Sequence, residues 1–359
     1  MNEKRIGGID LVRTAAILFV ILLHSITLSG ILDGARTWQW GIALYVRQLA
    51  MSAVPLFLML SGYLQRKKKF CLSYYRSIFP LYLSYAVISA LCMLAYAVQG
   101  YLQGNMDLTF VTAVYKILNF SANGYAWYFE MYLGLFLLIP FLNMIYGGIR
   151  TKCGKLILIG SLVFLTILPD TIAGFSPYYS GSTVALNIFP DFFKSMYPIT
   201  FYYIGSYIAE YKPRIPNFVK GISLLVAPAV PMALVVLYTW LRRGYAWYLL
   251  NGFQTLTVMM TALAVFLTLY DVEIRPLLLR KGCAHIALCT FEMYLLSYLW
   301  DNLLYTVLDL DTKIPIPALA ALVFAGTFLS AFVLRLLLRP LNAAIEKLTN
   351  CLIGSTEEL

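Results

Sequence analysis

The stretch from Ile9 to Leu28, IDLVRTAAILFVILLHSITL, decides the fold class because it is long and apolar enough to cross a bilayer as a helix. It nevertheless contains three ionisable residues, Asp10, Arg13 and His24. A charged side chain costs roughly 2.5 to 3.5 kcal/mol at the centre of a membrane helix, so such residues mark functional sites by default. At about 100° per residue, Arg13 and His24 fall within roughly 20° of each other, and Asp10 lies one turn before Arg13. We therefore expect all three side chains to face the interior of a helix bundle.

The composition indicates a membrane protein throughout its length. Hydrophobic residues make up 61% of the chain and charged residues 12%, against about 25% charged residues in soluble proteins. We predict an all-α integral membrane protein of about ten transmembrane helices, forming a single polytopic domain over residues 1–359, since no Pro/Gly/Ser linker divides the chain. The predicted spans are residues 9–28, 42–62, 77–98, 129–146, 155–172, 196–210, 219–240, 253–270, 285–304 and 318–338. Eight or nine spans remain open, because the sixth window is short and polar and only a brief turn separates the fourth from the fifth.

Lys and Arg are concentrated in alternate connections between these spans, for example at Lys67–Lys69 and Arg150–Lys155. Because positively charged loops stay in the cytoplasm, this alternation predicts that both termini are cytoplasmic. The net charge of +10 then reflects topology and attraction to anionic membrane lipids, and no nucleic-acid partner is expected. Two histidines, six cysteines without C-x-x-C spacing and scattered carboxylates form no ligand cluster, so no metal site is expected.

The spacing of Arg13 and His24, with ten residues between them in GIDLVRTAAILFVILLH, resembles the opening signature of the membrane acyltransferase 3 family. This family comprises ten-helix O-acyltransferases of cell-surface polysaccharides and peptidoglycan. Further blocks resemble the family's in the same order along the chain, namely Ala53–Leu64, Ala126–Pro140, Phe201–Ala209 and Phe291–Tyr298. The membrane part of vancomycin-resistance serine racemases is similar to this family too, and is associated with serine handling instead of acyl transfer.

Two positions depart from the family's pattern. Members commonly carry an Arg-x-x-Arg pair at the start of the third helix, whereas this chain has Arg76 followed by Phe79. Many members also have a histidine in the penultimate helix where this chain has Ser297. The second basic contact is therefore in doubt, and no activity of this chain can depend on that histidine.

The resemblance implies an acyltransferase that uses cytoplasmic acetyl-CoA as donor substrate and modifies a cell-envelope glycan or lipid-linked saccharide outside a bacterial cytoplasmic membrane. Arg13 and Arg76 are the expected donor-binding residues. His24, about 16 Å further along the helix than Arg13, is the expected catalytic residue, either as general base on the acceptor hydroxyl or as the nucleophile that carries the acyl group. Asp10 is expected to neutralise and orient Arg13.

Four further residues are candidates for the lining of the site: Glu130, Glu292, Trp127 and Tyr128. Glu292 lies within a predicted span and must be paired or protonated, with Arg47, Arg76 or Arg335 as possible partners. A structural ion pair is the competing interpretation for Glu292, and an interfacial aromatic belt is the competing interpretation for Trp127 and Tyr128.

Arg13 and His24 also have explanations that involve no function. Arg13 can extend to the membrane interface, and His24 can be an interfacial hydrogen-bonded residue. Two other functions stay open as well. A transporter of an amino acid or glycan unit would use the same intramembrane charges, and a non-catalytic sensor or partner subunit would not need His24. The sequence leaves the acyl group, the acceptor and the oligomeric state undetermined.

Overall fold

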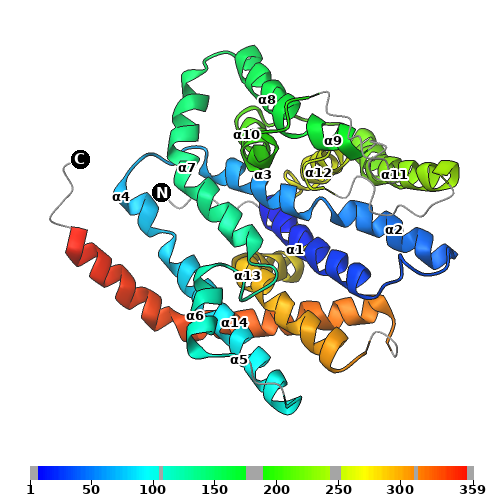
Figure 1. The fold of residues 1–359 in the computed structure, drawn as a ribbon. Helices are drawn as coiled ribbons and strands as arrows, with labels where there is room; N and C mark the ends of the chain where they lie inside the picture. The colour runs from blue at the N-terminus through cyan, green and yellow to red at the C-terminus, as the bar shows by residue number, and fades with distance from the viewer. Residues whose placement is uncertain (1–6, 105–107, 175–188, 243–251, 311–313, 354–359) are drawn as a thin grey trace. The chain divides into compact units, whose positions relative to one another are not determined.

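The computed structural model describes residues 7–104, 108–174, 189–242, 252–310 and 314–353, and every long regular element in them is a helix. The first seven helices are α1 (Gly7–Leu28), α2 (Trp38–Ala50), α3 (Ala53–Gln65), α4 (Leu72–Arg76), α5 (Phe79–Leu102), α6 (Phe110–Leu118) and α7 (Trp127–Gly148). The remaining helices are α8 (Lys152–Thr166), α9 (Leu168–Gly174), α10 (Tyr197–Tyr211), α11 (Asn217–Arg242), α12 (Leu256–Leu269), α13 (Leu277–Asp301) and α14 (Ile316–Ile353). A short 3₁₀ helix (Lys194–Met196) precedes α10 and a π-helical turn (Asn302–Val307) follows α13 (Figure 1).

Each of the ten predicted spans coincides with helix, which confirms the all-α membrane class. Eight helical segments of the described residues are long and apolar enough to cross a membrane. The other two windows correspond to α10, of 15 residues, and α12, of 14 residues. Both are shorter than the roughly 20 residues that a full crossing needs. The count of ten and the cytoplasmic location of both termini therefore remain predictions.

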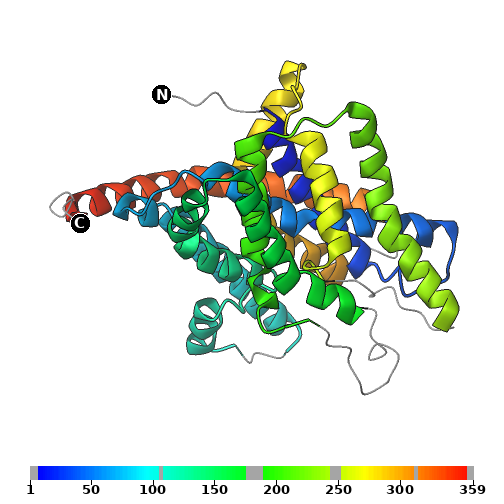
Figure 2. The ribbon, with the colours of Figure 1, turned by 90° about the horizontal axis from the view of Figure 1, so that it is seen from above.

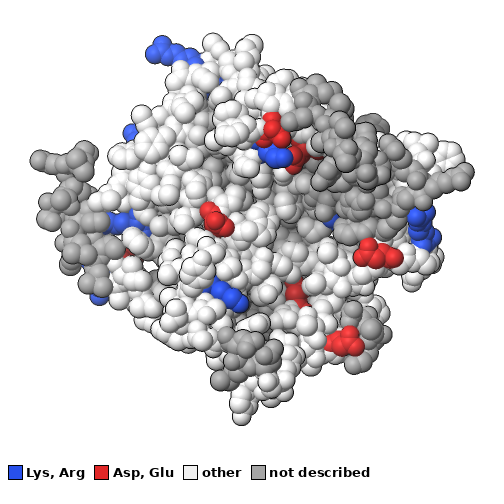
Figure 3. Space-filling model, viewed as in Figure 1, with Lys and Arg blue, Asp and Glu red and all other residues white. Residues whose placement is uncertain are grey.

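Apolar side chains on the outside of several helices are consistent with a lipid environment. Helix α11 is one of the most apolar segments, and it exposes Leu225, Leu237 and Trp240 on its outside. Figure 3 shows charged side chains only sparsely scattered over the described part of the face that it displays. In water such a surface would be unfavourable, whereas in a bilayer it needs no protein cover.

The contacts of the chain divide it into two compact units. Unit 1 consists of residues 1–68 and 138–287, and unit 2 consists of residues 69–137 and 288–359. Helices α7 and α13 each continue from one unit into the other. Within unit 2, α14 runs as one helix although Pro340 lies inside it (Figure 2).

The centre of unit 1 is the contact between α3 and α10, where two glycines allow the backbones to touch. A Cβ atom at Gly62 would lie 1.8 Å from the carbonyl oxygen of Tyr202, and one at Gly205 would lie 1.9 Å from that of Met59. Ser206 adds a hydrogen bond from its hydroxyl to the carbonyl oxygen of Gly62 at 3.2 Å. Close approach through small residues is the usual way in which helices associate in lipid, where no hydrophobic force drives them together.

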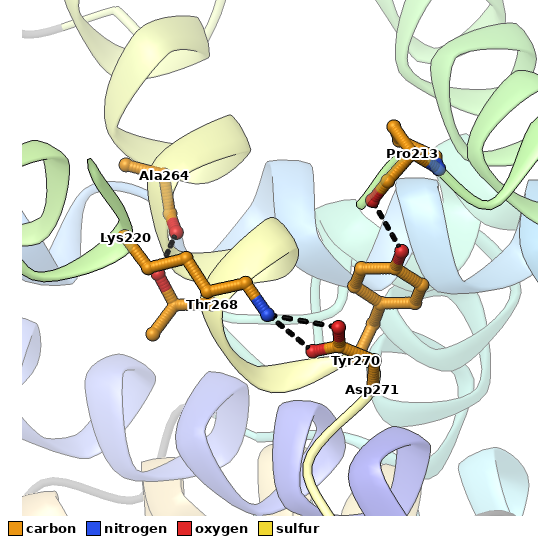
Figure 4. A network of polar contacts seen from close by, with 6 residues as sticks. All are labelled: Pro213, Lys220, Ala264, Thr268, Tyr270 and Asp271. Atoms are coloured by element: carbon orange, nitrogen blue, oxygen red, sulfur yellow. Dashed lines mark hydrogen bonds and ion pairs between the residues drawn. The ribbon is translucent and has the colours of Figure 1, made fainter. Parts of the chain in front are cut away.

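Two buried lysines tie further helices of unit 1 together. Lys155 on α8 donates to both carboxylate oxygens of Glu210 on α10 at 2.7 and 2.8 Å. Lys220 on α11 donates to both carboxylate oxygens of Asp271, which follows α12, at 2.6 and 2.8 Å (Figure 4). A buried charge persists only with such a partner. These lysines therefore link neighbouring helices of unit 1.

Candidate functional site

Helix α1 carries Asp10, Arg13 and His24 as one continuous 22-residue helix. Asp10 is buried in its first turn, and Arg13 and His24 are half-buried. Ile17 and Val20, which lie between Arg13 and His24 along the same face, are 0% and 3% exposed. The stripe from Arg13 to His24 is therefore the inward side of α1, as the spacing predicted.

The N-terminal end of α1 is fixed against the end of α12. A Cβ atom at Gly8 would lie 2.3 Å from the carbonyl oxygen of Tyr270, so the two backbones are in direct contact. Tyr270 in turn donates from its hydroxyl to the carbonyl oxygen of Pro213 at 2.6 Å, next to the ion pair of Lys220 and Asp271 (Figure 4). The end of α1 that carries Asp10 and Arg13 is thus held in place by backbone contact and by a polar network.

The C-terminal end of α1 packs beside an interruption of the next span. Leu23 forms a buried cluster with Ala50, Met51 and Val258. Between α2 and α3 the helix is interrupted at Met51 and Ser52, and the Ser52 hydroxyl donates to the carbonyl oxygen of Leu49 at 2.6 Å. Broken helices occur in membranes where backbone is buried in protein or lines a cavity. His24, the residue after Leu23, therefore lies at the depth of this interruption.

In unit 2, Glu292 has the structural ion pair that was one of its two interpretations. Nη1 of Arg335 on α14 lies 3.2 and 3.1 Å from the two carboxylate oxygens of Glu292 on α13. The Ser84 hydroxyl on α5 donates to the same carboxylate at 3.3 Å. Of the three possible partners, Arg335 is thus the one observed, and the pair joins three helices around the buried Glu292.

The same unit contains a buried carboxylate that the sequence reasoning missed. Asp301, 2% exposed at the end of α13, accepts a hydrogen bond from the Tyr125 hydroxyl at 2.8 Å. The Tyr294 hydroxyl donates to the carbonyl oxygen of Tyr125 at 2.6 Å, and the Asn123 amide donates to the carbonyl oxygen of Leu295 at 2.8 Å. Burial, together with the charge of Asp301, raises the pKa of the Tyr125 phenol, which therefore stays protonated and donates. The available signal was the position of Asp301 inside the predicted ninth span.

The three remaining candidates of α7 differ in exposure. Tyr128 is buried and packs edge-on against the Tyr294 ring at 5.3 Å between centroids. Trp127 is 38% exposed, which fits an interfacial aromatic residue, and Glu130 is exposed in the first turn. A carboxylate in the first turn interacts favourably with the helix N-terminus. Tyr128 alone among them is part of the packed interior around Tyr125 and Tyr294.

The two departures from the family's pattern have local explanations. Arg76 is the last residue of α4, and Phe79, in place of a second arginine, begins α5 with 48% of its surface exposed. Ser297, in place of a histidine, is fully buried and donates to the carbonyl oxygen of Tyr294 at 2.7 Å. Ser297 thus fits the packed interior, and Phe79 is an exposed apolar residue at the start of a helix.

The structure brings the predicted residues together in two groups, each inside one unit. Asp10, Arg13 and His24 share a helix of unit 1. The other predicted residues, Arg76, Trp127, Tyr128, Glu130 and Glu292, belong to unit 2. Among the described residues, no group of three or more His, Cys, Asp and Glu side chains is placed to hold a metal ion.

Comparison with protein families gives a match over nearly the whole chain. A family model described as an acyltransferase domain, that of the acyltransferase 3 family, matches residues 6–336 and so covers the helices from α1 to most of α14. No curated protein matches the chain. No solved structure matches it either.

Proposed function

Because the chain belongs to the acyltransferase 3 family and is a transferase of acyl groups, we propose that it moves an acetyl group from cytoplasmic acetyl-CoA to a hydroxyl of a cell-envelope glycan. The acceptor is either the glycan itself or a lipid-linked saccharide on the outer side of a bacterial cytoplasmic membrane. The described residues contain eight helical segments that are apolar and long enough to cross a bilayer, which supports a reaction that joins a donor and an acceptor from opposite sides.

The observation that carries this proposal is the inward stripe of α1. Arg13 and His24 are about 16 Å apart along the helix axis, from eleven residues at about 1.5 Å each. Buried Ile17 and Val20 fill the interval, whereas both polar side chains stay half-buried. One helix thereby presents a cation at one depth and an imidazole at another, which suits a long substrate that enters from one side and reacts further out.

Arg13 binds the anionic part of the donor in this proposal. A guanidinium group matches the geometry of phosphate oxygens and keeps its charge at every physiological pH. Asp10, buried one turn earlier, orients this guanidinium and lies where a helix N-terminus favours a carboxylate. The roles expected of the unit 2 residues rest on the sequence alone, and these residues are Arg76, Glu130, Glu292, Trp127 and Tyr128.

His24 acts on the acyl group by one of two routes. As a general base, its imidazole takes the proton of the acceptor hydroxyl while the hydroxyl oxygen attacks the thioester carbonyl carbon. The carbon–sulfur bond then breaks, and the thiolate of CoA receives the proton. As a nucleophile, the imidazole attacks the thioester first, CoA leaves, and the acceptor hydroxyl then takes the acyl group from His24.

The test supplies radiolabelled acetyl-CoA inside right-side-out membrane vesicles and measures label in the outer glycan fraction. Wild-type protein should transfer label, and His24→Ala should lose at least about 100-fold of the rate, the lower range of a general-base contribution. Leu18→Ala is the matched control, because Leu18 lies on the same helix but is 38% exposed on the outward side. It should transfer label at the wild-type rate.

Two results would overturn the proposal. One is transfer by His24→Ala within tenfold of wild type, which removes the chemical role of the imidazole. The other is the absence of label transfer by wild-type protein together with uptake of a labelled solute that His24→Ala abolishes, which is the outcome that a transporter predicts.

A further inference from the structure

Gln48 on α2 is a buried amide whose hydrogen-bonding groups are unused within the described residues. Its side chain is 1% exposed, and neither Nε2 nor Oε1 has a hydrogen-bond partner there. A primary amide offers two donors and an acceptor with two lone pairs, and burying it without partners is unfavourable. Such a group in a native protein needs an explanation, and a ligand that supplies the missing partners is one.

Gln48 belongs to the buried stripe of α2, which also contains Trp40, Leu44, Arg47 and Met51. These positions follow the three- and four-residue spacing of one helix face. Arg47, 3% exposed, brings a guanidinium to the same face. The amide therefore points into packed protein and not toward lipid.

Gln48 lies at the depth of His24. Helices α1 and α2 pack against each other and run in opposite directions, joined by residues 29–37 (Figure 1). The cluster of Leu23 with Ala50 and Met51 fixes which parts of the two helices are level. Gln48 precedes Met51 by three residues, about 4.5 Å along the axis, which places it level with the one or two residues after His24.

Ser25, the residue after His24, has a second unused polar group at this depth. It is fully buried, and its hydroxyl has no hydrogen-bond partner in the described residues. The other hydroxyl residues of α1 behave differently, because Thr14 and Thr27 donate to the carbonyl oxygens of Asp10 and Leu23 at 2.9 and 2.8 Å. The hydroxyl of Ser25 is thus available to a ligand although a helix ordinarily offers it a partner.

We infer that the Gln48 amide and the Ser25 hydroxyl bind a secondary amide of a substrate at the depth of His24. A secondary amide presents one N–H donor and one carbonyl acceptor, which the carboxamide of Gln48 can satisfy together and the hydroxyl can supplement. The inference rests on the proposed function, whose substrates contain this group in two places. One is the pantetheine arm of acetyl-CoA, and the other is the acetamido group of an N-acetylated sugar in the acceptor.

Gln48→Met tests the inference because it keeps the shape of the side chain and removes the amide. The variant should unfold at the same temperature as wild type or higher, since it removes an unsatisfied buried group. Its affinity for the molecule whose amide binds at this place should fall about 10-fold, which corresponds to the loss of one or two neutral hydrogen bonds. Ser25→Ala should show a smaller loss. Leu44→Met, one turn away on the same buried face, is the matched control and should bind as wild type does.

The binding probes separate the two sources. Acetyl-pantetheine and S-ethyl thioacetate both contain the thioester, but only the former contains amides. Chitotriose in its fully N-acetylated form and cellotriose are both β-linked trisaccharides. Only the former contains acetamido groups. If the pantetheine arm is the ligand, Gln48→Met weakens the binding of acetyl-CoA and acetyl-pantetheine and leaves the affinity for chitotriose unchanged. If the acceptor is the ligand, Gln48→Met weakens the binding of chitotriose alone and leaves the affinity for acetyl-CoA unchanged.

Two outcomes contradict the inference. In the first, folded Gln48→Met and Ser25→Ala bind both amide probes with wild-type affinity. In the second, Gln48→Met lowers the unfolding temperature clearly below that of Leu44→Met, which shows that the amide is part of the protein's own hydrogen bonding. Failure of wild-type protein to bind acetyl-CoA at all is a different result, because it contradicts the proposed function itself.

Discussion

Arg335 and Glu292 form an ion pair whose two sides differ in exposure. The Glu292 side chain is 7% exposed and the Arg335 side chain 41% exposed, with Nη1 and Oε2 separated by 3.1 Å. The carboxylate thus depends on a partner that reaches it from a more open position. In lipid, a buried carboxylate without such a cation would have to be protonated or would destabilise the fold.

Removing the arginine should therefore harm the fold more than removing both partners. We expect Arg335→Met to destabilise the protein by about 2 to 3 kcal/mol, below the 3 to 5 kcal/mol of a fully buried pair because Arg335 is partly exposed. The double variant Glu292→Leu/Arg335→Met should recover most of this loss. Thermal unfolding in detergent measures both, and a double variant as unstable as Arg335→Met would contradict the pairing.

The contact of Gly62 and Gly205 predicts a steric effect that the apolar pattern alone does not. Gly205→Ala should destabilise the protein by about 3 kcal/mol or more, because its Cβ would overlap the Met59 carbonyl group at 1.9 Å and neither backbone can move freely. Gly160→Ala on α8 is the control, since a Cβ there has no atom within 4 Å and alanine favours the helix by about 0.5 to 1 kcal/mol. Equal unfolding temperatures for the two variants would show that α3 and α10 are not in close contact.

These glycines also show what the sequence could and could not reveal. The blocks Ala53–Leu64 and Phe201–Ala209 resembled the family's pattern, and the structure shows that they pack on each other through one glycine each. Hydropathy predicted the helices, because length and apolar content are properties of each segment alone. It did not predict which helices meet, since apolar residues pack equally well against lipid and protein.

The candidate site was predictable to a similar extent. The shared face of Arg13 and His24 follows from helical periodicity and required no partner helix. The pairing of Glu292 with Arg335, the hydrogen bond between Tyr125 and Asp301 and the unused amide of Gln48 depend on contacts between segments far apart in the chain. A single sequence contains no measure of those distances.

The cytoplasmic location of both termini remains to be tested by labelling. We expect Lys68→Cys to react with a membrane-impermeant maleimide only after permeabilisation, and Gln103→Cys to react in intact cells. Both positions are exposed, so accessibility within the protein does not limit the reaction. The native thiols Cys71 and Cys153, which are exposed too, must first be replaced. Labelling of residue 68 in intact cells would show that the orientation is the reverse of the predicted one. The donor would then have to enter from the other side. The alternation of charged loops also predicts that residues 177–183 face outward, and these residues lie outside those that the structure describes.

The final prediction separates donor binding from chemistry along α1. If Arg13 holds the donor while His24 acts three turns away, Arg13→Ala should weaken acetyl-CoA binding by about 10- to 150-fold, the worth of one charge-assisted contact of about 1.5 to 3 kcal/mol. Arg13→Lys should recover only part of this affinity, because an ammonium group keeps the charge and loses the planar set of donors. His24→Ala should bind acetyl-CoA nearly as well as wild type while it loses acyl transfer. Calorimetry on the purified variants measures the affinities, with Leu18→Ala as the control on the exposed side of the same helix. Unchanged acetyl-CoA affinity in folded Arg13→Ala would show that Arg13 is an interfacial anchor and that the donor binds elsewhere.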